Sequence, residues 1–226
     1  EGVHVKGHGT IALITYLRTD STRISEEADA ACKEFIAQNY GSENIIEGAM
    51  APKSNKKIQD AHEAIRPTYV DLTPAQVKDS LTRDQFRLYQ LVWKRFVASR
   101  MHSAKYETLS VKIDGNGHRF TSAGSKLVVP GFLAVYQAEE DKEEKNPTLS
   151  KLKEDSVLSF EQLKEEQHFT QPPAHFTEAS LVKTLEELGI GRPSTYAPTI
   201  STLVYRRYVV KEQKNLYMSD IGDAVN

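Results

Sequence analysis

Tyr16 and Arg18 stand two residues apart and form the pair in this sequence best suited to covalent chemistry on a phosphate group. If the segment is extended, this spacing puts both side chains on the same side of the backbone. A tyrosine hydroxyl, with an ordinary pKa of about 10, is a poor nucleophile at neutral pH and needs charge stabilisation before it can attack. The arginine fork supplies it, because it binds two phosphate oxygens and offsets the negative charge that develops as a phosphodiester is attacked. Alone, such a pair is more often an ordinary surface feature, so the prediction depends on other segments.

A second segment adds groups of the same kind. A short helical turn over residues 59–66 would place His62 and Arg66 four apart on one face. An imidazole that is cationic or donates a proton, next to an arginine, suits a phosphate. By itself this histidine is more often an ordinary surface or core residue. The polar residues shortly after Arg18 that could orient the first pair are Asp20, Ser21, Thr22 and Arg23.

The composition is that of an ordinary globular protein, with 39% hydrophobic and 27% charged residues. The longest apolar stretches, 9–14 and 127–136, are far shorter than the roughly 20 residues of a membrane span, and the first residues do not form a signal peptide. The single cysteine, Cys32, cannot form an internal disulfide, and no Cys or His cluster has zinc spacing. A reducing cytoplasm is therefore expected. The net charge of −2 gives no overall basic field, so nucleic-acid binding would depend on local patches.

Capping residues predict the helices of the first hundred positions. Ser25 as N-cap and Gly41 as a stop predict a helix over 26–40. Thr73 before a proline predicts a second helix, and the capping box that begins at Thr82 predicts a third. The third helix carries apolar and aromatic residues at three- and four-residue spacing, which we interpret as a core stripe and not as a base-stacking platform: Phe86, Tyr89, Trp93, Phe96 and Val97.

From Tyr106 the hydrophobic period changes to two. This pattern predicts a strand, a turn at 114–117 and a returning strand from Arg119. Residues 126–136 are predicted to give at least one further strand, and residues 157–160 together with 161–166 another. The charged stretches predicted to be surface loops are 51–60, which is rich in lysine, and 139–146.

The C-terminal part predicts helix, turn, helix and then a two-stranded wing. Thr177 caps a helix over 178–188, a glycine-rich turn follows, and a second helix runs from about 195 to 206. Residues 208–218 give two short strands joined by a tight turn, and 221–225 a last helical piece. This is the order of a winged-helix motif, which often binds nucleic acid, although such helix pairs also serve as plain packing units. The residues that would contact phosphate are Arg192, Ser194, Thr195, Arg206, Arg207 and Lys211.

Three motifs follow one another along the chain: the run from Tyr16 to Thr22, the run from Ala61 to Pro67, and the segment 176–208 around Gly189-Ile190-Gly191-Arg192-Pro193-Ser194-Thr195-Tyr196. Taken in this order they closely resemble the type IA DNA topoisomerases. The resemblance extends over nearly the whole chain and includes residues 168–174. Leu17 is closer to bacterial topoisomerase I, where methionine is usual, than to the topoisomerase III branch, which tends to have proline there.

The resemblance implies a role for individual residues. Tyr16 matches the nucleophile that attacks a single-stranded DNA phosphodiester, leaving a 5′-phosphotyrosine and a free 3′-hydroxyl that the same site can reseal. Arg18 matches the arginine that holds the scissile phosphate, and His62 matches a histidine associated with DNA phosphate. The residues implied to support them are Asp20, Thr22 and Arg66. The residues implied to hold the single strand are Arg192, Ser194, Thr195 and Tyr208, and Arg207 stands where a glycine is expected.

The resemblance also implies parts that this sequence does not contain. The family coordinates Mg²⁺ through acidic residues of an N-terminal Toprim domain, which also supplies a catalytic glutamate and lysine, whereas this sequence has no Asp-x-Asp pair. The zinc-binding C-terminal modules of some members are not found either. We therefore expect a central fragment of a bacterial topoisomerase I without its Toprim domain, which holds no metal, binds single-stranded DNA weakly and does not cleave it.

The expected fold is α+β in three pieces. These are a mostly helical domain over 9–101 that bears the nucleophilic tyrosine, antiparallel β-strands of an arch over 102–168, and a helical, winged DNA-binding segment over 169–226. In the whole enzyme they would support transient cleavage of one strand, passage of the other and religation, which relaxes negatively supercoiled DNA. The expected partners are single-stranded or negatively supercoiled DNA and the missing Toprim domain, and the expected location is the cytoplasm, at the nucleoid. The alternatives are a non-catalytic winged-helix module and a scaffold without a DNA role, which would show no salt-sensitive DNA binding.

Overall fold

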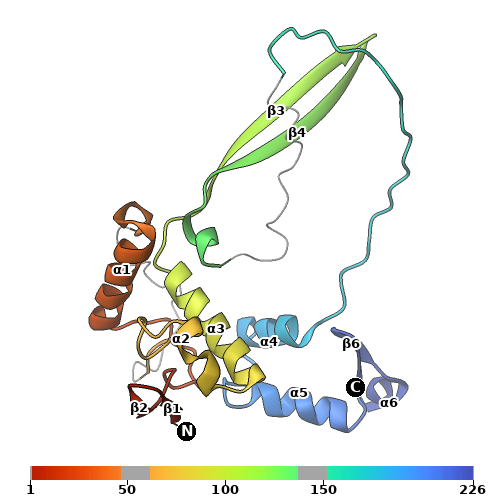
Figure 1. Ribbon diagram of the computed structural model, residues 1–226. Coiled ribbons are helices and arrows are strands. Elements are labelled where there is room, and N and C mark those ends of the chain that lie inside the picture. The colour runs from red at the N-terminus through yellow and green to blue at the C-terminus, as the bar shows by residue number, and fades with distance from the viewer. Residues whose placement is uncertain (1, 47–61, 137–151, 226) are drawn as a thin grey trace. The chain divides into compact units, whose positions relative to one another are not determined.

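The computed structural model describes residues 2–46, 62–136 and 152–225 (Figure 1). The chain forms two compact units, 1–158 and 159–226. Within the described ranges there are six α-helices and three two-stranded antiparallel sheets, so the predicted α+β class is confirmed. None of the helices in these ranges is long and apolar enough to cross a lipid bilayer.

The helices of the first unit begin where the capping residues predicted. Helix α1 spans Glu26–Tyr40, and the Ser25 hydroxyl accepts a hydrogen bond from the backbone N–H of Ala28. Short helix α2 spans Pro74–Val77, and α3 spans Arg83–Ala98 with a complete capping box between Thr82 and Gln85. Each cap satisfies N–H groups that have no partner inside the helix, so these starts are set locally.

The core of the first unit is built on the predicted stripe of α3. Tyr89, Trp93, Phe96 and Val97 are all buried, and α1 adds Cys32 and Ile36 to the same cluster. The indole N–H of Trp93 donates to the carbonyl of Val70 at 2.8 Å, and the Tyr89 hydroxyl donates to the carbonyl of Leu72 at 2.6 Å. Both aromatic side chains therefore bury their rings without leaving a polar atom unpaired. A small hairpin of β1 (Val3–Val5) and β2 (Gly9–Ile11) adds Val5 to this core.

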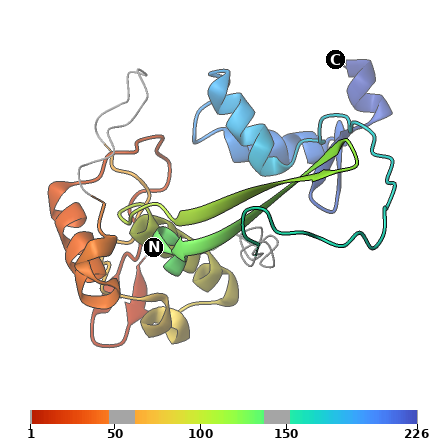
Figure 2. The ribbon, with the colours of Figure 1, turned by 90° about the horizontal axis from the view of Figure 1, so that it is seen from above.

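A long hairpin follows the helices. Strands β3 (Lys105–Gly115) and β4 (His118–Val129) run side by side over their whole length, as Figure 2 also shows. Asn116 and Gly117 form the turn with positive φ at both positions, which is the turn geometry that matches strand twist. The predicted strand, turn and returning strand are therefore confirmed.

The prediction of a further strand over 126–136 was wrong. Strand β4 runs on without a break to Val129, and Gly131–Ala134 form the 3₁₀ helix η3. Pro130 between them has no N–H to continue a ladder, and Gly131 takes a φ of 50° close to the carbonyl of His102, where a side chain would collide. The chain leaves the sheet at this point for these two reasons.

The prediction of a strand over 157–166 was also wrong. Residues 152–176 contain neither helix nor strand, and the side chain of Val157 is 98% exposed. An apolar run forms a strand only if a neighbouring strand accepts its hydrogen bonds, and none does so in the described part of the chain. The two stretches predicted as surface loops, 51–60 and 139–146, lie outside the described residues.

The second unit has the predicted order of helix, turn, helix, hairpin and helix. Helices α4 (Glu178–Glu187) and α5 (Tyr196–Tyr205) are followed by strands β5 (Val209–Glu212) and β6 (Asn215–Met218) and then by α6 (Asp220–Val225). A single antiparallel bridge joins Thr177 to Asn215, so the residue that caps α4 is also tied to the wing. Among the described residues of the second unit, the buried apolar side chains are those of Ile200 and Leu216.

Candidate active site

The Tyr16 segment is held against the His62 segment by backbone hydrogen bonds. The N–H of Thr15 donates to the carbonyl of Arg66, and the N–H of Thr68 donates to the carbonyl of Leu13, both at 3.0 Å. These two bonds enclose an antiparallel bridge between Ile14 and Pro67. The two sequence motifs that were expected to form one site are therefore brought together by main-chain pairing.

This pairing places the ring of Tyr16 on the ring of His62. Their centroids lie 4.9 Å apart and their planes are inclined by 32°. The side chain of Tyr16 is 54% exposed and His62 is also exposed, so the phenol is open to a ligand from outside. The contact combines a nucleophile candidate with a group that can carry or donate a proton.

The segment after Tyr16 is not a strand. The chain bends at Leu17 and Arg18, so the alternation of an extended segment does not set the relative directions of Tyr16 and Arg18. Arg18 is exposed, and its guanidinium forms no ion pair with any described residue. Guanidinium donors that no described carboxylate engages are available to a ligand.

The predicted helical turn over 59–66 was wrong for the residues that the structure describes, 62–66. Their backbone groups bond to other segments instead. The N–H of Ala64 donates to the carbonyl of Arg23 at 2.8 Å, and the N–H of Arg66 donates to the Thr15 hydroxyl at 3.0 Å. Long-range partners therefore replace the i to i−4 bonds of a helix.

Arg66 is bound internally. Its Nε and Nη2 contact Oε2 of Glu63 at 2.8 and 2.7 Å, and its Nη1 donates to the carbonyl of Pro67 at 3.0 Å. Burial opposes the charge of Glu63, but hydrogen bonds from Arg66 and Ser25 and the nearby charges of Arg66 and Arg23 more than offset it, so the pKa of Glu63 is lowered. The ion pair is therefore a structural part of the His62 segment.

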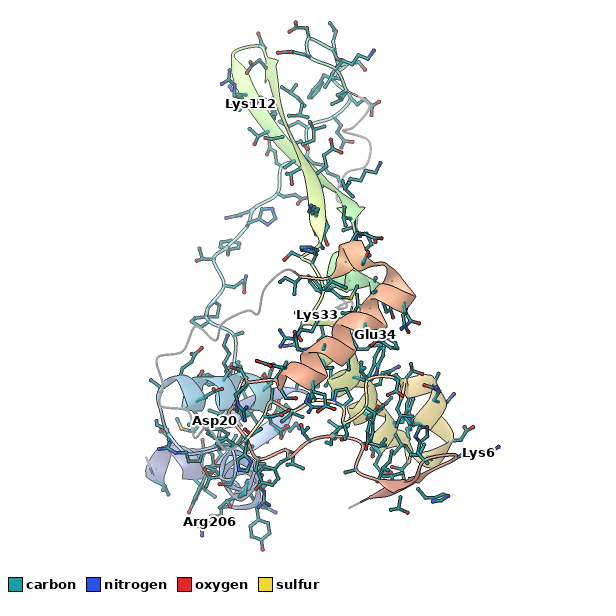
Figure 3. All side chains as sticks on the ribbon, turned by 90° about the vertical axis from the view of Figure 1, so that its left-hand side faces the viewer. Lys6, Asp20, Lys33, Glu34, Lys112 and Arg206 are labelled. Carbon is teal, nitrogen blue, oxygen red and sulfur yellow. The ribbon has the colours of Figure 1, made fainter. Side chains whose placement is uncertain are left out.

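The polar residues after Arg18 divide into two kinds. Asp20, which Figure 3 labels, and Thr22 are exposed. Ser21 is buried; its hydroxyl accepts from the N–H of Arg23 at 3.2 Å, and its own N–H donates to the Thr19 hydroxyl at 3.0 Å. Ser21 thus shapes the loop that leads into α1, while Asp20 and Thr22 face solvent.

Three of the DNA-contact residues predicted in the second unit lie on the turn between α4 and α5. Arg192, Ser194 and Thr195 are exposed. The Thr195 hydroxyl accepts from the N–H of Arg192 at 2.8 Å and donates to its carbonyl at 3.0 Å, which closes the turn. Tyr208 is half-buried at the start of the wing, where its carbonyl accepts from the N–H of Ser219 at 3.1 Å.

Arg207 occupies the position that favours glycine. Its φ is 59°, its N–H donates to the carbonyl of Val204, and the N–H of Tyr208 donates to the carbonyl of Leu203. These two bonds define a Schellman motif, whose left-handed residue is usually glycine. Helix α4 ends in the same motif with Gly189 at a φ of 71°. The left-handed backbone conformation explains why a glycine is expected at this position. Arg207 adopts the same conformation at a steric free-energy cost.

The described residues do not fit a magnesium site. Mg²⁺ prefers clustered oxygen ligands such as carboxylates. In the ranges that the structure describes, no group of three or more His, Cys, Asp and Glu side chains could hold a metal ion. The carboxylate in the His62 segment, Glu63, is already bonded to Arg66.

Sequence reasoning gave no role to two residues that build the site. Thr15 directly precedes the first recognised motif and Glu63 lies inside the second, but nothing in their spacing indicated their partners. The Thr15 hydroxyl bonds to the main chain of Ala64 and Arg66, and Glu63 binds the side chain of Arg66. Such links between distant segments carry no local sequence signal.

Residues 9–226, which include the whole of this site, match the family model of DNA topoisomerase. The chain therefore belongs to the type IA DNA topoisomerase family, and the resemblance is confirmed. Among solved structures, full-length topoisomerase I from Thermotoga maritima, in a monoclinic crystal form, is 36% identical, with a TM-score of 0.76. The match covers 99% of this chain and 36% of the Thermotoga protein, so this chain spans about a third of that relative's length.

Proposed function

We propose that this chain carries the DNA-cleaving tyrosine of a type IA topoisomerase and acts on single-stranded DNA. The observation that carries the proposal is the contact between the exposed ring of Tyr16 and the ring of His62 at 4.9 Å. Because the chain belongs to this family, we assign the role of nucleophile to the exposed tyrosine in this motif. Arg18, exposed on the adjacent bend, is the proposed clamp for the scissile phosphate.

The proposed reaction is a transesterification. The phenolic oxygen of Tyr16 attacks phosphorus, a bond between that oxygen and phosphorus forms, and the bond from phosphorus to the 3′ oxygen breaks. The phenol loses its proton and the leaving oxygen gains one, which leaves a 5′-phosphotyrosine and a 3′-hydroxyl. Arg18 stabilises the charge on the phosphate oxygens as the bonds exchange. His62 contacts the phenol and adds a donor toward the phosphate.

The type IA family uses Mg²⁺, and the residues that the structure describes do not fit a site for it, so no step here is assigned to the metal. We propose that a separate metal-binding Toprim domain completes the active site. On its own the 226-residue chain should then bind single-stranded DNA without cleaving it. With that domain, cleavage, passage of the second strand and religation would relax negatively supercoiled DNA at the nucleoid in the cytoplasm.

The exposed turn between α4 and α5 is proposed to hold the backbone of the single strand. Arg192 supplies a cation and Ser194 a hydroxyl, and the N–H of Ala197 in the first turn of α5 has no acceptor among the described residues. Tyr208 lies where the wing begins and is proposed as a further contact. Supporting roles near the scissile phosphate are proposed for Asp20 and Thr22.

The test joins this chain in one polypeptide to the metal-binding N-terminal domain of a type IA topoisomerase. A single-stranded oligonucleotide labelled at its 3′ end is added with Mg²⁺, and the mixture is denatured to trap covalent adducts. We expect an adduct on Tyr16 that is absent from Tyr16→Phe, while Tyr69→Phe, a change at another half-exposed tyrosine, retains it. An adduct that survives Tyr16→Phe would remove Tyr16 from the mechanism.

A non-catalytic module is the competing function, and the order of helix, turn, helix and hairpin in the second unit favours it. It predicts salt-sensitive DNA binding but no adduct in the joined polypeptide. Robust magnesium-dependent cleavage by the isolated chain would contradict the need for a second domain.

A further inference from the structure

The hydroxyl of Thr15 forms a side-chain link between the two motifs of the proposed active site. Thr15 Oγ1 donates to the carbonyl of Ala64 at 2.8 Å and accepts from the N–H of Arg66 at 3.0 Å. Thr15 directly precedes Tyr16, and Ala64 follows His62 by two positions. One hydroxyl therefore fixes the distance between the two short stretches of chain that carry the paired rings.

The Thr15 hydroxyl takes the place of one main-chain hydrogen bond between the two segments. In a regular antiparallel pair, Thr15 and Arg66 would exchange two N–H to carbonyl bonds. The first of these is present, since the N–H of Thr15 donates to the carbonyl of Arg66 at 3.0 Å. The N–H of Arg66 instead donates to the Thr15 side chain. The main chain alone therefore leaves this end of the pairing incomplete.

The partner segment is held firmly on its other side. Ala64 donates to the carbonyl of Arg23, Pro67 is fully buried, and Arg66 is tied to Glu63 by two close contacts. The Thr15 hydroxyl therefore makes its two hydrogen bonds to a segment whose own position is fixed by other contacts. The exposed rings of Tyr16 and His62, in contrast, have little core packing to hold them.

We propose that Thr15 is a positioning residue, whose hydroxyl sets the placement of Tyr16 against His62 for the attack on phosphate. The inference rests on the proposed function for its catalytic consequence, but the ring placement can be measured without catalysis. A displacement of about 1 Å at a reacting group can lower a rate by about 100-fold, so a link one residue from the nucleophile is expected to matter for the rate.

Thr15→Val removes both hydrogen bonds and keeps the shape of the side chain, whereas Thr15→Ser keeps the hydroxyl. The first measurement is proton NMR of the 226-residue chain. The ring current of Tyr16 changes the chemical shifts of the His62 ring protons, and comparison with Tyr16→Ala gives the size of this change. We expect Thr15→Ser to keep most of the shift and Thr15→Val to lose at least half of it. A full shift in Thr15→Val would overturn the proposal.

The second measurement uses the polypeptide joined to the metal-binding domain. We expect Thr15→Val to slow adduct formation about 10- to 100-fold with an unchanged dissociation constant for the oligonucleotide, and Thr15→Ser to restore the rate. A loss of binding together with rate, or no rescue by serine, would indicate a general structural role and contradict the proposal. If the wild-type chain gives no adduct but the NMR result holds, the proposed function fails and the positioning role of Thr15 stands.

The fold of each variant is checked by the fluorescence of Trp93, the single tryptophan, which is buried and bonded to Val70 far along the chain from Thr15. If Thr15→Val does not fold, Thr15→Ala replaces it in both measurements. Thr15→Ala also lacks the hydroxyl, it leaves the two main-chain bonds of the bridge in place, and the same losses are expected.

Discussion

The rings of Tyr16 and His62 lie with their centroids 4.9 Å apart and their planes inclined by 32°, although the two residues come from separate segments of the chain. Neither side chain belongs to the core, so burial does not explain the contact. The main-chain pairing of Ile14 with Pro67 and the hydroxyl of Thr15 bring the segments together. The site is thus built by hydrogen bonds near the surface, and its residues can be changed without opening the core.

The first prediction concerns His62. Replacement by alanine removes the ring that contacts Tyr16 and a donor near the phosphate, so adduct formation by the joined polypeptide should slow about 100-fold. Rates are measured with the single-stranded oligonucleotide at saturating concentration. The control is His118→Ala, which removes an exposed histidine next to the turn of the β3–β4 hairpin and should leave the rate unchanged. Equal rates for wild type and His62→Ala would exclude a catalytic part for His62.

The second prediction concerns the ion pair of Glu63 with Arg66. Both side chains are mostly buried, at 24% and 14% exposure, so Glu63→Gln should lower the free energy of unfolding by about 1–2 kcal/mol at pH 7. The pKa of Glu63 is lowered in the folded chain, so this stabilisation is present above the unfolded pKa of about 4.3 and is lost as the pH falls through the folded pKa. The difference between wild type and variant should therefore shrink below about pH 4.

Urea unfolding followed by Trp93 fluorescence measures this difference. Glu34→Gln is the matched control, because Glu34 is exposed on α1 (Figure 3) and accepts a hydrogen bond from Gln38 at 3.1 Å on the surface. We expect it to change stability by less than about 0.5 kcal/mol at either pH. A Glu63→Gln variant as stable as wild type at pH 7 would show that the pair is not needed to hold the His62 segment.

Local signals predicted those elements whose starts are set by their own neighbours. The caps at Ser25 and Thr82 gave α1 and α3, and the Asn116-Gly117 turn gave the long hairpin. The site was predicted only as two motifs. The prediction of a helical turn at His62 was wrong because the backbone groups of residues 62–66 form hydrogen bonds with residues far away in sequence. Neither the hydrophobic period nor the capping residues of a segment indicate such distant partners.

The third prediction follows from the positive φ of Arg207. Glycine removes the steric free-energy cost of the left-handed conformation. This cost is larger than the free energy lost through the greater conformational entropy of glycine in the unfolded chain. Arg207→Gly should therefore stabilise the second unit by about 0.5–1 kcal/mol. Arg206 carries the same side chain at a φ of −77°, so Arg206→Gly should destabilise it by a similar amount. Amide hydrogen exchange at Leu216, whose N–H donates to the carbonyl of Phe176, measures both changes. Changes of the same sign in the two variants would contradict the strain argument.

The fourth prediction concerns the exposed turn between α4 and α5. If Arg192 binds a backbone phosphate of single-stranded DNA, its replacement by alanine should weaken binding to oligonucleotides of different sequence by similar factors, because phosphate contacts carry no base information. It should also lower the slope of log K against log salt by about 0.7, the loss expected for one contact on a single strand. Lys183→Ala is the control, since Lys183 is an exposed cation on α4 whose Nζ lies 4.0 Å from Glu187. Fluorescence anisotropy over a salt series distinguishes the two variants. Equal slopes for Arg192→Ala and wild type would mean that Arg192 faces solvent in the complex, and the strand would then have to be held elsewhere.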